Sequence, residues 1–129
     1  MRSFRQSLAA AALLAALAPA AQAYDFFTPV SQSQTGEVFY CTIVNVGSTP
    51  AAVSASARSM VDGSDLNVSG NCPKAPATLA PGTACFSYSS QSGAQSAYCH
   101  FTSTSSKVRA DLIIFGTNGG VLDTMPATR

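Results

Sequence analysis

The sequence predicts an all-β protein, a single antiparallel β-sandwich of seven to eight strands cross-linked by two disulfides. Three observations support this fold class. Beyond the first 23 residues, called the leader below, no segment keeps a helical period. Runs of alternating apolar and polar residues recur instead, at a spacing of roughly 8 to 15 residues. The chain also carries four cysteines, all of them behind the leader.

The first 23 residues are predicted to be a secretory signal peptide, cleaved after Ala23. Arg2 and Arg5 give a positive start, residues 8–18 are uniformly apolar, and Ala21 and Ala23 form a small-residue cleavage site. The apolar run is about half of the roughly 20 residues that a membrane-spanning helix needs. We therefore expect a secreted or periplasmic protein with no membrane span after cleavage and one domain over residues 24–129.

Each strand is expected from alternating or β-branched residues bounded by turn residues. Pro29 suits the first strand to a sheet edge, and Asp62 and Gly63 indicate a hairpin turn. The predicted strands are Phe26–Val30, Glu37–Val46, Ala52–Val61, Leu66–Val68, Ala84–Ser90, Ser96–Thr102, Lys107–Phe115 and a short Val121–Leu122.

Alternation within these strands predicts which side chains face the core, because successive residues of a strand point to opposite faces. The inward sets are Phe39, Cys41 and Ile43, then Val53, Ala55, Ala57, Ser59 and Val61, then Ala97, Cys99 and Phe101, and finally Val108, Ala110, Leu112 and Ile114.

The four cysteines are interpreted as two disulfides. Their separations leave 30, 12 and 13 intervening residues, so neither the close pairs of a structural zinc site nor a redox C-x-x-C is present. Cys41 and Cys99 lie mid-strand, and Cys72 and Cys85 enclose a short proline-containing segment. The favoured pairing is Cys41–Cys99 with Cys72–Cys85, and the alternative is Cys41–Cys72 with Cys85–Cys99.

Charge excludes one class of partner. The whole chain has seven basic and six acidic residues, but removing the leader removes two arginines, which leaves five basic against six acidic residues and a net charge of about −1. Nucleic-acid binding needs a basic patch that this chain does not have, so no nucleic-acid partner is expected.

No catalytic or metal motif stands out, and we expect neither enzymatic activity, nor a metal, nor a cofactor. His100 is the only histidine, no G-x-S-x-G is present, and a hydrolase would need His100 to meet an acid such as Asp111 and a serine in space. Asp62, Asp65 and Asn67 form an oxygen-rich stretch, but it has neither the length nor the terminal glutamate of a calcium loop.

Aromatic residues are the best indication of binding. Phe86 and Tyr88 share one face of their strand, opposite Cys85. If Cys85 points inward they face solvent or a partner, and if Cys85 lies on the rim they belong to the core. The candidate binding surface consists of Tyr40, Phe86, Tyr88, Tyr98 and His100.

The order of these motifs resembles bacterial immunoglobulin-like sandwich domains, similar to the choice-of-anchor and ASPM-SPD2-Hydin-like modules of exported proteins. The resemblance covers about Val38 to Phe115 and implies an immunoglobulin-like fold with a structural or binding role rather than a reaction. The matching positions are Asn45, Gly47, Val53, Cys72, Leu79, Pro81, Gly82 and Cys85.

The expected function is therefore a small exported, non-catalytic module with a structural or protein-interaction role at the cell envelope or outside the cell. Its partner would be another exported or envelope protein. One alternative is a subunit of a strand-exchanged envelope assembly, in which residues 24–30 are donated to a neighbour. The other is a small secreted hydrolase or a hydrolase inhibitor.

Overall fold

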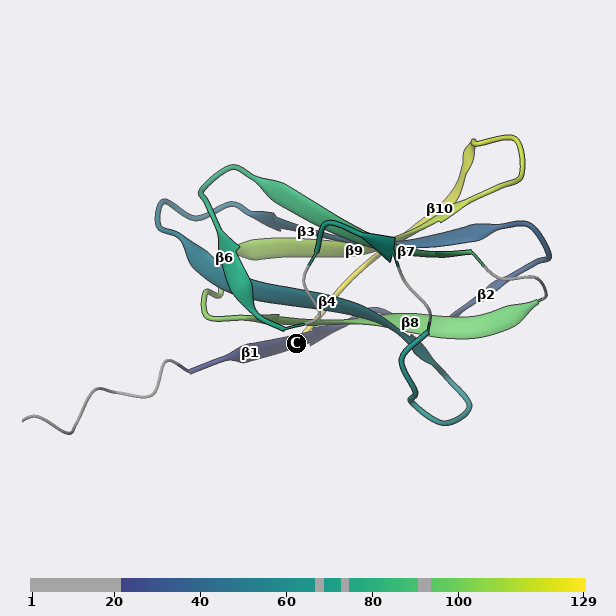
Figure 1. The fold of residues 1–129 in the computed structure, drawn as a ribbon, viewed down its shortest axis with the longest axis horizontal. Coiled ribbons are helices and arrows are strands. Elements are labelled where there is room, and N and C mark those ends of the chain that lie inside the picture. The colour runs from purple at the N-terminus through teal and green to yellow at the C-terminus, as the bar shows by residue number, and fades with distance from the viewer. Residues whose placement is uncertain (1–21, 67–68, 73–74, 91–93) are drawn as a thin grey trace, which may run out of the picture.

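Two antiparallel sheets pack face to face in the computed structural model, and Figure 1 shows them edge-on as an upper and a lower layer. The structure describes residues 22–66, 69–72, 75–90 and 94–129, and this part of the chain contains strands and turns but no helix, hence none that could cross a membrane. The lower layer, sheet A, has the order β1-β8-β4-β6, and β2 also pairs with β8. The upper layer, sheet B, has the order β10-β9-β3-β7-β5.

The strand bounds follow. Sheet A contains β1 (Tyr24–Phe27), β2 (Ser31–Ser33), β4 (Ala51–Ser59), β6 (Ala77–Leu79) and β8 (Gln95–Ser103). Sheet B contains β3 (Val38–Asn45), β5 (Ser69–Gly70), β7 (Ala84–Ser90), β9 (Val108–Phe115) and β10 (Val121–Pro126).

The core lies between the sheets, and alternation places it where the sequence predicts. Phe39, Cys41 and Ile43 of β3 are fully buried, as are Cys99 and Phe101 of β8. The Cys41–Cys99 disulfide crosses the middle of this core and joins the two sheets, with the Cα atoms 5.6 Å apart. The favoured disulfide pairing is confirmed.

One edge of sheet A is a strand interrupted at a proline. Phe27 pairs with His100 at the end of β1, and Ser31 pairs with Ala97 at the start of β2. Between them the Thr28 hydroxyl accepts the backbone N–H of Cys99 at 2.9 Å, which satisfies a buried donor where the ladder breaks. The predicted position at a sheet edge is thus confirmed, but the predicted bounds are wrong. The strand covers Tyr24–Phe27 rather than Phe26–Val30, and Pro29 lies in the gap before β2.

Each lateral opening of the sandwich is closed by a segment that crosses between the sheets. On one side the chain leaves β5 of sheet B, pairs through β6 with β4 of sheet A, and returns to β7 of sheet B. The Cys72–Cys85 disulfide joins the two ends of this crossing segment, with the Cα atoms 4.9 Å apart. The interpretation of this stretch as a disulfide-closed loop is confirmed, and the loop also supplies an edge strand.

On the other side the C-terminal residues cross from sheet B to sheet A. Beyond β10, Ala127 donates its N–H to the carbonyl of Ala110. Thr128 then exchanges two backbone hydrogen bonds with Phe27 of β1, at 2.8 and 2.9 Å. The guanidinium of Arg129 lies 4.5 Å from the ring centroid of Tyr24. In Figure 1 the C-terminus accordingly lies beside β1.

The structure departs from the predicted strands in other places too, and β10 covers Val121–Pro126 rather than Val121–Leu122. It has ten strands in the described residues rather than seven or eight, because β2, β5 and β6 are two- or three-residue pairings too short to show a period. β4 ends at Ser59, so Val61 lies in the hairpin turn and is 91% exposed rather than inward. In the predicted strand Leu66–Val68, Leu66 is buried outside any strand, and residues 67–68 lie outside the described part.

Candidate interaction surface

The outer face of sheet B carries a cluster of aromatic side chains, here called the aromatic face: Tyr40, Phe86, Tyr88 and Phe115. Tyr40 lies on the central strand β3, directly across from Tyr88 on β7 and Ile113 on β9. Cys85, Ser87 and Ser89 alternate with Phe86 and Tyr88 along β7 and are buried. The first of the two interpretations of β7 is therefore correct: Cys85 points inward and the two aromatic rings point outward.

Tyr40 is the centre of the aromatic face. Its ring centroid lies 4.9 Å from that of Phe115, 5.3 Å from that of Tyr88 and 5.8 Å from that of Phe86. The pair with Phe115 is edge-on and the pair with Tyr88 is nearly parallel, which are the two arrangements that aromatic quadrupoles favour. The rings therefore hold one another in place across three strands, and the surface they present is ordered before any partner binds.

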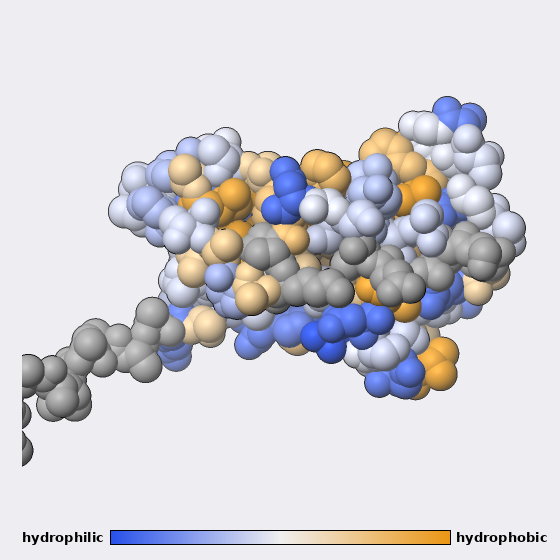
Figure 2. All heavy atoms as spheres, in the orientation of Figure 1, coloured by the Kyte–Doolittle hydropathy of each residue, from blue (hydrophilic) through white to orange (hydrophobic). Residues whose placement is uncertain are grey.

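Apolar residues extend this face in the direction of β10. Val38 and Val121 pair with Phe115 on either side of it, and Val121 is 57% exposed. Phe86, at the opposite side, is 38% exposed. Figure 2 shows orange, apolar atoms among paler and blue ones along the upper layer of the molecule.

Two charged side chains lie at one end of the aromatic face. Arg109 and Asp111 are two residues apart on β9 and so share the outer face, where Asp111 pairs with Thr42. Within the described residues neither side chain forms an ion pair. The face is thus apolar at its centre, with a cation and an anion at its margin, the distribution that distinguishes the core and the rim of protein interfaces.

The outer face of sheet A is polar by comparison, and its polar groups are paired with one another. The hydroxyls of Ser54 and Thr102 lie 2.6 Å apart across β4 and β8. Arg58 hydrogen-bonds the hydroxyl of Ser56 and the carbonyl of Gly63, and its guanidinium lies 3.5 Å from Asp65. Figure 2 shows blue atoms along much of the lower layer, with orange atoms at the hairpin that projects from it.

His100 belongs to this polar face and joins β8 to β1. Its Nε2 lies 2.9 Å from a carboxylate oxygen of Asp25, and its ring stacks on Phe27 with centroids 4.6 Å apart and planes within 3°. Tyr98 lies beside Phe27, with centroids 6.4 Å apart. Sequence reasoning missed Asp25 and Phe27 as partners of His100, since only the pairing of β1 with β8 brings them together.

The hydrolase alternative named Asp111 as an example of an acid that could meet His100. Asp111 lies on the outer face of sheet B, whereas His100 lies on the outer face of sheet A, so the two side chains are on opposite surfaces of the sandwich. Throughout the described part of the chain, no hydroxyl hydrogen-bonds the imidazole of His100. The His100–Asp111 pairing is therefore wrong.

The five residues of the predicted binding surface fall on two faces. Tyr40, Phe86 and Tyr88 meet on sheet B, and Phe115 joins them. Tyr98 and His100 lie on sheet A with Phe27, on the other side of the core. Sequence reasoning grouped them because it had no means of assigning strands to sheets.

The oxygen-rich stretch after β4 is a hairpin turn with its own internal bonds. Asp62 accepts hydrogen bonds from the hydroxyl and the backbone N–H of Ser64, and these bonds, the hydroxyl first, lower the pKa of Asp62. Asp65 is paired with Arg58, and Asn67 lies outside the described residues. Among the residues that the structure describes, no group of three or more His, Cys, Asp or Glu could hold a metal ion.

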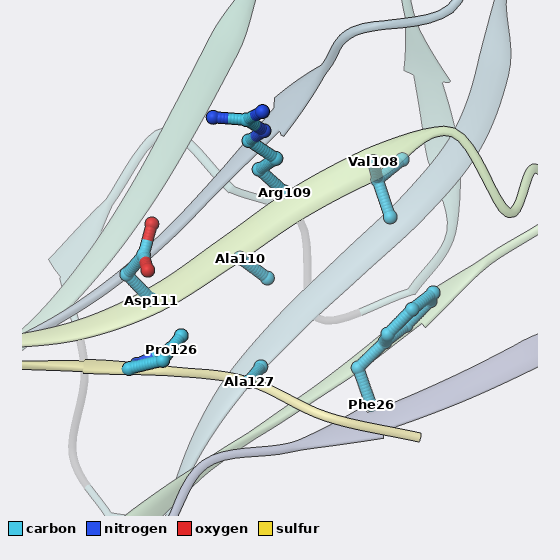
Figure 3. Close-up of a pocket in the computed structure, with 7 residues that line it drawn as sticks. All are labelled: Phe26, Val108, Arg109, Ala110, Asp111, Pro126 and Ala127. Atoms are coloured by element: carbon cyan, nitrogen blue, oxygen red, sulfur yellow. The ribbon is translucent and has the colours of Figure 1, made fainter.

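A shallow cavity of about 390 Å³ lies at the seam where the C-terminal segment crosses between the sheets. Figure 3 shows Phe26 of β1 on one side and Ala110 of β9 and Ala127 on the other. Arg109 and Asp111 point away from these apolar residues, in keeping with their place on the outer face of sheet B. Polar and apolar atoms contribute about equally to the lining of this cavity.

Comparison with known proteins supplies no relative: no family model, no curated protein and no solved structure matches this chain.

Proposed function

We propose that this chain is a small exported, non-catalytic β-sandwich module that acts through contacts with another exported or envelope protein. The observation that supports this proposal most strongly is the aromatic face, an ordered cluster of four rings on one side of a chain whose other side is polar and internally paired. Phe86 is exposed and the other three rings are half-buried, and an apolar surface patch of this kind is a common mark of a binding site. Tyrosine and phenylalanine are also enriched at protein interfaces.

Three features support export. The leader has the three regions of a signal peptide, cleavage after Ala23 would leave the chain starting at the first residue of β1, and all four cysteines are in disulfides. The proposed location is secreted or periplasmic. Expression of the full chain in a bacterium, followed by mass spectrometry of the mature protein, tests this. An uncleaved chain in the cytoplasm with four reduced thiols would contradict it.

Binding through the aromatic face is tested by a pair of matched variants. Phe86→Ser with Tyr88→Ser removes two rings from the aromatic face. Met60→Ser with Val61→Ser removes two exposed apolar side chains from the hairpin at the far side of the molecule. We expect crosslinking in the native envelope or culture medium to yield a discrete partner with the wild type and the hairpin variant, and none with the aromatic variant. Identical products from both variants would exclude the aromatic face as the contact surface.

The strand-exchange alternative makes a different prediction. β1 is already paired with β8 of its own chain and is bridged to Thr128 on its outer side. Exchange would therefore require both sets of hydrogen bonds to open and to re-form with a second copy. A concentration-dependent dimer in size-exclusion chromatography, abolished by deletion of residues 24–27, would favour this alternative over the proposal.

A further inference from the structure

Two adjacent rows of side chains cross the outer face of sheet B where the aromatic face meets its charged margin. The register places one row across β7, β3 and β9 at Phe86, Thr42 and Asp111. It places the next row across the same strands at Ala84, Val44 and Arg109. Figure 3 shows the side chains of Arg109 and Asp111 on the same side of β9. Each row thus carries two uncharged residues and one charge, and the two charges have opposite signs.

Opposite charges on adjacent rows make this surface complementary to a second copy of itself. A two-fold axis between the two rows would lay the row of Asp111 in one copy over the row of Arg109 in the other. By symmetry, each Arg109 would then meet Asp111 of the second copy, and each Phe86 would lie over the small side chain of Ala84. In the part of the chain that the structure describes, neither Arg109 nor Asp111 forms an ion pair, so these contacts would displace none there.

Edge-to-edge pairing, the other way in which two copies of sheet B could associate, is blocked at β10. Ala127 donates its N–H to Ala110 of β9, so in this ladder Thr124 and Pro126 direct their backbone groups away from β9. Pro126 has no N–H, and the N–H of Thr124 donates to the carboxylate of Asp123 at 2.8 Å. Over residues 123–126, β10 therefore offers no free donor to a further strand, whereas the outer face stays open to a partner.

The size of the face fits a weak, reversible dimer. The strands β7, β3, β9 and β10 have six to eight residues each. Four such strands span about 24 Å by 19 Å, or about 450 Å² of projected area. Stable complexes bury about 800 Å² on each partner, and transient complexes bury less.

We propose that the aromatic face, with Arg109 and Asp111 at its margin, is the contact surface of a symmetric, reversible homodimer of this chain. The two rows lie at the centre of the contact, and Tyr40 and Tyr88 extend it on both sides of the two-fold axis. This inference rests on the proposed function, because it assigns a partner to the aromatic face.

The dependence of mass on concentration tests the dimer. The mature, disulfide-bonded chain is followed by sedimentation velocity from about 1 μM to about 1 mM, and we expect a reversible monomer–dimer transition in this range. Phe86→Ser with Tyr88→Ser should abolish the transition. Met60→Ser with Val61→Ser is the matched control on the far hairpin and should leave the transition unchanged.

Charge exchange tests the two-fold arrangement. Arg109→Asp and Asp111→Arg each place like charges over one another at both symmetric contacts, so each variant should dimerise at least about tenfold more weakly than the wild type. The chain with both substitutions has the wild-type net charge and restores both ion pairs. Its dissociation constant should return to within about threefold of the wild-type value. Circular dichroism of each variant confirms that it is folded.

Three outcomes would overturn the proposal. The first is a wild-type chain that stays monomeric up to about 1 mM, a result that needs no variant to fold. The second is a dimer that the charge variants form as well as the wild type, which would exclude the two-fold contact and would be compatible with strand exchange. The third is native crosslinking through the aromatic face to a different protein, in which case the proposed function stands and the second copy is excluded as its partner.

Discussion

At the scale of single residues, Asn45 shows how one buried polar side chain can hold several segments together. It is fully buried at the end of β3, and its Nδ2 donates to the carbonyls of Thr49 and Leu79, at 2.9 and 3.0 Å. Its Oδ1 accepts the N–H of Gly47. One amide thus joins sheet B to the turn that follows it and to β6 of sheet A. Asn45 and Gly47 are among the positions that carry the resemblance to immunoglobulin-like modules, and this hydrogen bond joins them.

We expect Asn45→Ala to lower the free energy of unfolding by about 3 kcal/mol, because it leaves buried carbonyls unpaired and opens a cavity. Chemical denaturation of the oxidised protein measures the change. Asn71→Ala is the control, since Asn71 is exposed and, among the residues that the structure describes, its side chain bonds only the N–H of Phe86. This variant should lower the free energy of unfolding by about 1 kcal/mol. Equal losses of stability in the two variants would show that the buried network contributes no more than one exposed hydrogen bond.

At Gly70 the backbone conformation and the neighbouring atoms leave no room for a side chain. Its φ is +139°, and a Cβ placed on it would lie 2.2 Å from the carbonyl oxygen of Phe86. We expect Gly70→Ala to destabilise the fold by about 3 kcal/mol through steric conflict and backbone strain. Gly82 also has a positive φ, at +71°, but a Cβ placed on it would meet nothing within 4 Å. We therefore expect Gly82→Ala to lower the free energy of unfolding by only about 1 kcal/mol. Thermal unfolding of both variants makes the comparison, and a smaller loss for Gly70→Ala than for Gly82→Ala would contradict it.

At the scale of elements, the two disulfides lie in different places and stabilise different parts of the fold. Cys41–Cys99 joins β3 to β8 through the core, and both residues are fully buried. Cys72–Cys85 joins the two ends of the segment that carries β6 across to sheet A, so it holds an edge strand of one sheet by anchoring its ends to the other. The edge of β4 that β6 covers depends on this anchoring.

Removal of each bridge should therefore have a distinct effect. In the chain-entropy model, Cys41→Ala with Cys99→Ala costs about 4 kcal/mol and Cys72→Ala with Cys85→Ala about 3 kcal/mol. The two variants should differ more in which strands are destabilised than in the total loss of stability. Hydrogen exchange should report faster exchange throughout both sheets for the first variant, and chiefly at β4, β6 and the start of β7 for the second. Uniform acceleration in the second variant would show that the crossing segment is not an independent unit.

At the scale of the whole molecule, the two outer faces differ in kind. Sheet B presents the aromatic face, and sheet A presents paired hydroxyls, Arg58 with Asp65, and His100 with Asp25. Both sheets share a single core, and each lateral opening is closed by a crossing segment. Because the two sheets share one core, we expect the whole sandwich to fold and unfold as a single unit although its two outer faces differ.

Tyrosine fluorescence can test this cooperativity, because the chain has four tyrosines and no tryptophan. In Tyr98→Phe the remaining signal is weighted towards Tyr40 and Tyr88 of sheet B, and in Tyr40→Phe with Tyr88→Phe it comes from Tyr24 and Tyr98 of sheet A. Each variant's fluorescence transition should coincide with its far-ultraviolet circular dichroism transition, as two-state unfolding of one core requires. A fluorescence midpoint that precedes the circular dichroism midpoint in either variant would reveal a sheet that unfolds separately.

Much of this fold was predictable, and the failures have physical causes. The inward sets around Phe39 and Phe101 were correct because residues buried between two sheets alternate with a period of two. The disulfide pairing was correct because Cys41 and Cys99 lie in such sets. β2, β5 and β6 escaped prediction, since two or three residues carry no period and form strands only by pairing with a longer neighbour.

The candidate site was only partly predictable. Alternation along the strand showed that the side chains of Phe86 and Tyr88 lie on the same face of the sheet. It could not show whether that face is the outer one. It could not place Tyr40 beside them or Asp25 beside His100, because each of these contacts joins different strands. Strand pairing depends on the order of strands in each sheet, which no local pattern encodes.

The sequence by itself determined the all-β class and most inward residues of the long strands, because both follow from periodicity along the chain. It favoured the cysteine pairing that the structure contains and left one alternative open. Only the tertiary structure decided that Tyr40, Phe86, Tyr88 and Phe115 form one surface while Tyr98 and His100 belong to another. The physical reason is that a surface or a pocket is made by residues distant in sequence, and the assembly of strands into two sheets determines which of them meet.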